Sequence, residues 1–158
     1  MTETQKKWDD IMYSAISETI ESMAFMEVIP TDDSHEPEKD CLCVSLLVHD
    51  PVQGEFELFM GRDLITMLAD TVYGPVMAEV SDQNIFDLLA EILNTVVGRF
   101  MSDILPEDTS FKLGVPEICV GDCSRNTSSL KKWEYIIEDF TFGLTVTGES
   151  LLKLRNTT

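Results

Sequence analysis

The run of residues between positions 85 and 104 is the feature that most constrains how this chain can fold. Its apolar side chains recur at helical spacing, at Ile85, Leu88, Leu89, Ile92, Leu93, Val96, Val97, Phe100 and Ile104. They cover a little over half of the helix circumference, and a face this wide must pack against other elements. The sequence therefore predicts a long central helix that begins after the N-cap residue Ser81 and ends before Pro106.

The remaining arc of this helix is polar. It holds Asn84, Asp87, Glu91, Asn94, Thr95 and Gly98. Glu91 and Asn94 lie three residues apart, so a carboxylate and a carboxamide project side by side. A solvated surface is the ordinary explanation of such a stripe. However, asparagine is a mediocre helix former, and Asp87 and Glu91 repel each other slightly at i,i+4. This cost favours a functional face that enters a partner's cleft.

The other segments predict an α+β fold in a single domain over residues 1–158. Helical spacing recurs at residues 6–26 and 62–72, and strand patterns occupy residues 41–48, 55–60, 110–115, 117–120, 132–138 and 140–147. Residues 31–40 and 121–130 are polar connections, and the tail at 149–158 has no clear pattern. Helices and strands do not alternate regularly along the chain, so we expect a largely antiparallel sheet.

The chain is strongly acidic, with 11 basic and 29 acidic residues and a formal net charge of −18. This charge opposes binding to phosphate backbones, so we expect neither a nucleic acid nor a membrane as a partner. A protein with exposed lysine or arginine around an acidic pocket fits better. The first residues lack an apolar core, and no apolar stretch approaches the roughly 20 residues of a spanning helix, so we expect a cytoplasmic protein.

Four cysteines occur as Cys41-x-Cys43 and Cys119-x-x-x-Cys123. Neither spacing is that of the paired ligands in a zinc knuckle, and both pairs touch apolar strand segments. We expect buried thiols that act as small apolar side chains, and no metal ligands in this chain. A zinc-stabilised domain is the alternative.

The pattern Asp87, three residues, Glu91, two residues, Asn94 resembles the signature of the CheC/CheX/FliY family of chemotaxis phosphatases. The downstream segment 113–121, with Gly-x-Pro near its start and glycine at its end, resembles the strand that follows the signature in that family. The resemblance spans residues 8–148 and is closest to CheX. It implies two long helices on one face of the sheet, related by a pseudo-repeat.

The helix near the N-terminus carries a decayed copy of the signature, in which Ser14, Glu18 and Glu21 occupy the three positions. Glutamate stands at position 21 where the family pattern has asparagine. A second carboxylate cannot donate hydrogen bonds to phosphoryl oxygens and repels an anionic transition state. This departure predicts one active centre per chain.

The resemblance implies that the chain removes the phosphoryl group from the phosphoaspartate of a CheY-like response regulator. It assigns Asn94 to orienting the attacking water and Glu91 to a charge pair with the lysine of the regulator's receiver domain. Asp87, Thr95 and Gly98 are expected to contact the partner, Gly98 by allowing close approach. The Mg²⁺ of the reaction is expected to come from the phosphorylated regulator, with no cofactor bound by this chain.

The resemblance also implies a homodimer in which sheet edges join. The strands expected at 132–138 and 140–147 are the candidate edges. A non-catalytic module of the same fold is the alternative function, because an acidic surface with an exposed polar stripe serves binding equally well. Such a module would be a receiver-binding or signalling adaptor.

Overall fold

The computed structural model describes residues 3–32, 40–120 and 130–154, and within these ranges seven strands form one antiparallel sheet. The helices are α1 (Glu3–Ala24), α2 (Arg62–Tyr73), α3 (Asp82–Ile104) and α4 (Glu149–Lys153). The strands are β1 (Ile29–Thr31), β2 (Cys41–His49), β3 (Gly54–Gly61), β4 (Lys112–Leu113), β5 (Glu117–Val120), β6 (Leu130–Ile137) and β7 (Phe140–Thr147).

The strand order in the sheet is β1-β6-β7-β3-β2-β4, and β5 also pairs with β2. Strands β2 and β3 form the central hairpin, with a register that runs from Cys41 opposite Gly61 to Val48 opposite Gly54. Side chains alternate between the two faces of a strand. In β2 the even-numbered positions from 42 to 48 are apolar and almost fully buried, so this face of the hairpin forms the core.

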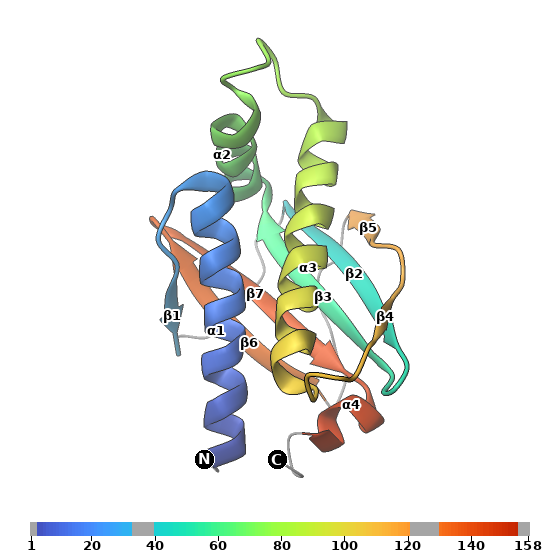
Figure 1. Cartoon of the computed structure of the whole chain (residues 1–158). Coiled ribbons are helices and arrows are strands. Elements are labelled where there is room, and N and C mark those ends of the chain that lie inside the picture. Colours follow the sequence, from blue (N-terminus) through green and yellow to red (C-terminus); the bar gives the residue numbers. More distant parts are fainter. Residues whose placement is uncertain (1–2, 33–39, 121–129, 155–158) are drawn as a thin grey trace.

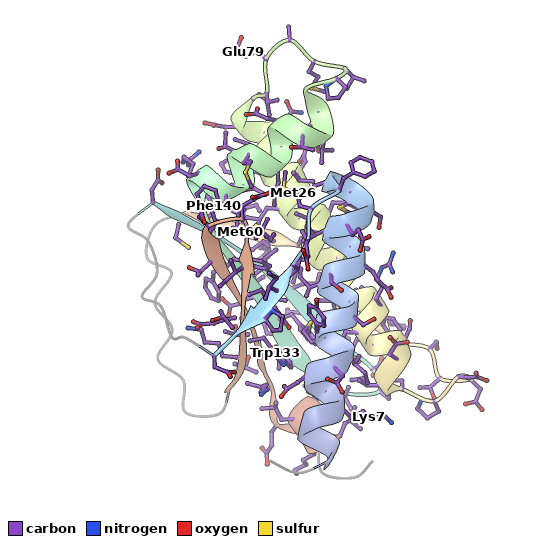
Figure 2. All side chains as sticks on the ribbon, turned by 90° about the vertical axis from the view of Figure 1, so that its left-hand side faces the viewer. Lys7, Met26, Met60, Glu79, Trp133 and Phe140 are labelled. Atoms are coloured by element: carbon purple, nitrogen blue, oxygen red, sulfur yellow. The ribbon has the colours of Figure 1, made fainter. Side chains whose placement is uncertain are left out.

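The long helices α1 and α3 lie side by side and run in opposite directions across one face of the sheet, with α2 beyond one end of α1 (Figure 1). A view turned by 90° places α1 and α3 on one side of the strands, with α2 above the end of the sheet (Figure 2). The predicted fold class is therefore confirmed as α+β, with an antiparallel sheet and two long helices packed on one face.

Phe100 of α3 joins the two layers. Its ring lies edge-to-face with Trp8 of α1, Phe56 of β3 and Trp133 of β6, with centroids 5.1, 5.6 and 5.9 Å away. Full burial of a phenylalanine side chain contributes about 1.5–3 kcal/mol, and such ring pairs add about 0.5–1.5 kcal/mol each. This cluster fixes which side of α3 faces the sheet.

The structure corrects three predictions at the edges of the sheet. The strand expected at 110–115 shrinks to Lys112–Leu113, because Pro116 has no N–H for a ladder and Val115 is 83% exposed. The short strand β1 was not predicted, and the tail begins with the helix α4. The prediction that the strands at 132–138 and 140–147 form an edge of the sheet is wrong. Strand β7 lies between β6 and β3, and β1 pairs with the other side of β6. The connection expected at 121–130 lies almost wholly outside the described residues.

Candidate functional site

The apolar stripe of α3 is buried as predicted, and the opposite side of the helix is open to solvent. Asp87 and Glu91 are exposed, and Asn94, Thr95 and Gly98 are partly exposed. These five residues are called the polar ridge below. The structure thus brings all the predicted site residues together on one surface of one helix.

The start of α3 is held by a reciprocal cap. The Ser81 hydroxyl accepts a hydrogen bond from the Asn84 backbone N–H at 3.2 Å, and the Asn84 side chain accepts one from the Ser81 N–H at 3.0 Å. Caps of this kind stabilise a helix by about 1 kcal/mol. Asn84, which the sequence placed in the polar arc, is therefore a capping residue, and the polar ridge begins one turn later at Asp87.

A groove of about 550 Å³ lies beside the later part of the polar ridge, from Asn94 to Gly98. It is lined by Asn94, Thr95, Gly98 and neighbouring residues of α3, by Ser14, Ala15 and Glu18 of α1, and by Phe111 and Leu113 after α3. A Cβ added to Gly98 would have no heavy atom within 4 Å. The missing side chain at position 98 therefore leaves helical backbone open to a partner.

Asn94 is one of the residues that line this groove. Among the described residues its side chain has no hydrogen-bond partner, whereas Glu91 and Asp87 on the polar ridge each accept a hydrogen bond from a residue of the same helix. Glu91 Oε1 accepts a hydrogen bond from Thr95 Oγ1 at 3.2 Å, and Asp87 Oδ1 accepts one from Gln83 Nε2 at 2.8 Å. A carboxamide has two donors and an acceptor oxygen, so Asn94 can bind a water molecule or an anionic oxygen.

Tyr73, the last residue of α2, is a neighbour of the polar ridge that the sequence analysis missed. Burial raises the pKa of its hydroxyl, and the negative charges of Asp87 and Glu91 raise it further. Tyr73 therefore stays protonated at neutral pH and remains a possible donor beside the two carboxylates. In the sequence Tyr73 stands directly before Gly74, and this position indicated only the end of a helix.

The sequence analysis also missed Arg99. Its Nη1 lies 2.8 Å from Glu18 Oε2, and the Ser14 hydroxyl donates to the other oxygen of Glu18 at 3.1 Å. All three residues line the groove, so two positions of the decayed signature, Ser14 and Glu18, share the groove with Asn94 of α3. The ion pair with Arg99 neutralises the charge of Glu18 beside the polar ridge and leaves other N–H groups of the guanidinium available as donors.

The cysteines fit the prediction in part. Cys41 and Cys43 of β2 are buried beside Phe59, but Cys119 of β5 is exposed rather than buried. Cys123 lies outside the described residues. Within the described ranges no three side chains of the histidine, cysteine, aspartate or glutamate type are placed to hold a metal ion together. The expectation that this chain binds no metal stays a prediction.

In the part of the chain that the structure describes, no helix has both the length and the apolar character needed to cross a membrane.

The fold is shared with solved chemotaxis proteins. CheX from Desulfovibrio desulfuricans superposes with a TM-score of 0.73 at 15% identity, over 90% of this chain and 99% of the other. Thermotoga maritima FliY gives a TM-score of 0.67 at 14% identity, over 99% and 96% of the two chains. The CheX of a CheX–CheY–BeF3–Mg²⁺ complex from Borrelia burgdorferi gives 0.66 at 15% identity, over 89% and 96%. No curated protein sequence matches significantly.

Residues 42–138 match the family model described as "Chemotaxis phosphatase CheX". This span covers more than half of the chain and contains the whole of α3. The chain therefore belongs to the CheX family, and the resemblance seen in the sequence is confirmed.

Replacing Gly98 with alanine should stabilise the protein by about 0.5–1 kcal/mol, because glycine in a helix interior costs this much and the added methyl group meets no neighbour. The free energy of unfolding, measured by urea denaturation, checks this expectation. Gly74→Ala is the contrasting variant. Its added Cβ would lie 2.3 Å from the Asp70 carbonyl oxygen, so this substitution should lower the free energy of unfolding. A loss of stability in Gly98→Ala would mean that position 98 is not open.

Proposed function

We propose that this protein hydrolyses the phosphoaspartate of a CheY-like response regulator, and that it does so by inserting the polar ridge of α3 into the regulator's active site. Membership of a family of chemotaxis phosphatases supports the activity. The Borrelia burgdorferi CheX in complex with CheY supports the class of partner. The observation that carries the proposal is that Asn94 lines an open groove one turn from the exposed carboxylate of Glu91, and that its side chain has no hydrogen-bond partner among the described residues.

Asn94 is the proposed catalytic residue. Hydrolysis of an acyl phosphate needs a water molecule in line with the P–O bond and little covalent help beyond that. A carboxamide can hold this water without placing another negative charge near the phosphoryl group. The Mg²⁺ of the regulator neutralises charge on the phosphoryl oxygens when it is bound there, and it is not proposed to bind to this chain.

The other residues of the polar ridge are proposed to dock the regulator. Glu91 pairs with the receiver's lysine, Asp87 and Thr95 form hydrogen bonds at the edge of the contact, and Gly98 allows close backbone approach. Arg99, held by Glu18 at the side of the groove, offers its remaining guanidinium N–H groups to acceptors at the edge of the receiver. On this proposal Glu18 positions Arg99 and does not form a second active centre.

Asn94→Ala should lower the rate of phosphoaspartate hydrolysis by about 100-fold, which corresponds to about 2.7 kcal/mol of lost positioning. Binding should stay nearly unchanged, because Glu91 and Gly98 remain. The assay follows phosphate release from a receiver domain charged with acetyl phosphate in the presence of Mg²⁺. Gln53→Ala removes an exposed carboxamide in the connection between β2 and β3 that does not line the groove, and it serves as the matched control. If the unmodified protein binds the charged receiver without accelerating release, it is an adaptor and the phosphatase proposal fails.

Glu91→Gln should weaken binding of the charged receiver by about 5–10-fold, because a charge pair with lysine is lost while the shape of the side chain is kept. The dissociation constant, measured by titration at low and high salt, checks this, and the difference between the two proteins should shrink at high salt. Glu138→Gln changes the net charge equally at an exposed position in the turn between β6 and β7. Equal effects of the two variants would contradict a specific docking role for Glu91.

The resemblance to CheX also leads us to propose a homodimer. The ends of the sheet are β1 on one side and β4 with β5 on the other, so sheets of two copies would join through one of these ends. Sedimentation equilibrium should give twice the chain mass of 17.8 kDa. A mass of one chain across the micromolar range would contradict the dimer.

A further inference from the structure

Two cysteines from distant parts of the sequence lie directly opposite each other in the sheet. Cys43 of β2 is the register partner of Cys119 of β5. The next residue, Val44, is fully buried in the main core under the helices. Because side chains alternate, Cys43 and Cys119 both lie on the other face of the sheet. The Cβ atoms of directly opposed residues are about 4.5–5.5 Å apart.

The two thiols differ in what can reach them. Cys119 is exposed, whereas Cys43 is only 3% exposed. The Cys43 thiol donates a hydrogen bond to Glu57 Oε2 at 3.4 Å, and Glu57 is itself only 1% exposed. An exposed sulfur therefore lies next to a buried sulfur that has a carboxylate beside it.

We propose that Cys43 and Cys119 form a thiol–disulfide site, which small-molecule disulfides of the oxidised-glutathione type convert to a cross-strand disulfide. The Cα atoms of an antiparallel pair lie about 4.5–5.5 Å apart, within the range that a disulfide spans. The Cβ atoms of a disulfide lie about 3.5–4.5 Å apart, so the strands must approach by roughly 1 Å when the bond closes. A bond closed under strain is easily reduced, so the oxidation is reversible.

The oxidation takes two exchange steps. The Cys119 thiolate attacks one sulfur of the small disulfide, which forms a mixed disulfide and releases one small thiolate. The Cys43 thiol then gives its proton to Glu57, and its sulfur attacks the Cys119 sulfur and displaces the second small thiolate. The released thiolates take up the protons from the two cysteines. Two protein thiols are oxidised to one disulfide, and one small disulfide is reduced to two thiols.

The bond would tie β5 to the central hairpin. Strand β5 contacts α3 as well as β2, and it lies beside that helix in the fold (Figure 1). Oxidation would therefore fix the segment that follows α3 without touching the polar ridge. This inference does not depend on the proposed phosphatase activity.

The test incubates the full chain in buffers with a fixed ratio of oxidised to reduced glutathione. Free thiols are then blocked, the protein is digested with a protease, and the peptides are analysed by mass spectrometry without reduction. We expect peptides containing Cys43 and Cys119 to be joined and to separate again when reduced glutathione is added in excess. Cys43→Ser should instead hold glutathione on Cys119, because the sulfur that releases it is gone. Cys119→Ser should give neither product.

Cys41→Ser is the matched control. Cys41 lies on the same face of β2, two residues before Cys43. Its register partner on β3 is Gly61, which has no thiol. This variant should form the bond between Cys43 and Cys119 as readily as the unmodified chain. The proposal fails if Cys119 bonds to Cys41 or Cys123 instead, or if glutathione stays on Cys119 to the same extent with and without Cys43. It also fails if Cys119 does not react.

Discussion

The packing of α3 against the sheet is the interaction on which the rest of the structure depends. Phe100 contacts aromatic rings from α1, β3 and β6, so one side chain of α3 connects the second long helix and two strands of the sheet. A helix has one rotation that buries its apolar stripe, and this rotation is fixed when Phe100 points into the core. Asn94 and Glu91, which are six and nine residues before Phe100 and point away from it, must then lie on the solvent side. The location of Glu91 and Asn94 on the surface is thus a consequence of core packing.

The relation between the two long helices gives the site its charge pattern. The decayed signature of α1 contributes Glu18 to the same groove as Asn94, but Glu18 is paired with Arg99 and hydrogen-bonded by Ser14. A carboxylate that was left unpaired there would add to the repulsion between an acidic chain and a phosphorylated partner. Pairing it with arginine removes that repulsion and leaves further N–H donors of the guanidinium available. Arg99 therefore balances the one carboxylate that α1 places in the groove beside Asn94.

The sequence predicted the elements whose pattern is local. The stripe of α3, its cap at Ser81 and the central hairpin follow from the spacing of nearby residues, and the polar ridge follows from the same helical geometry. Pairings between distant segments have no such signal. The three residues of β1 include Pro30 and form a strand only because β6 lies beside them. The ion pair of Glu18 and Arg99 joins residues 81 positions apart, and the opposition of Cys43 and Cys119 depends on the register between two strands.

The residues of the polar ridge lower the stability of α3, and packing of the core must offset this loss of free energy. Glycine in the interior of a helix costs about 1 kcal/mol relative to alanine, asparagine costs about 0.5–0.7 kcal/mol, and the carboxylates of Asp87 and Glu91 repel by a few tenths. These terms sum to about 2 kcal/mol, which is close to what the burial of one large apolar side chain of α3 supplies. A loop could present the same groups without this cost, but it would not hold the Asn94 amide in one place. A group that positions a water molecule by geometry alone loses its effect when it moves by about 1 Å, so a well-buried helix is the element suited to carry it.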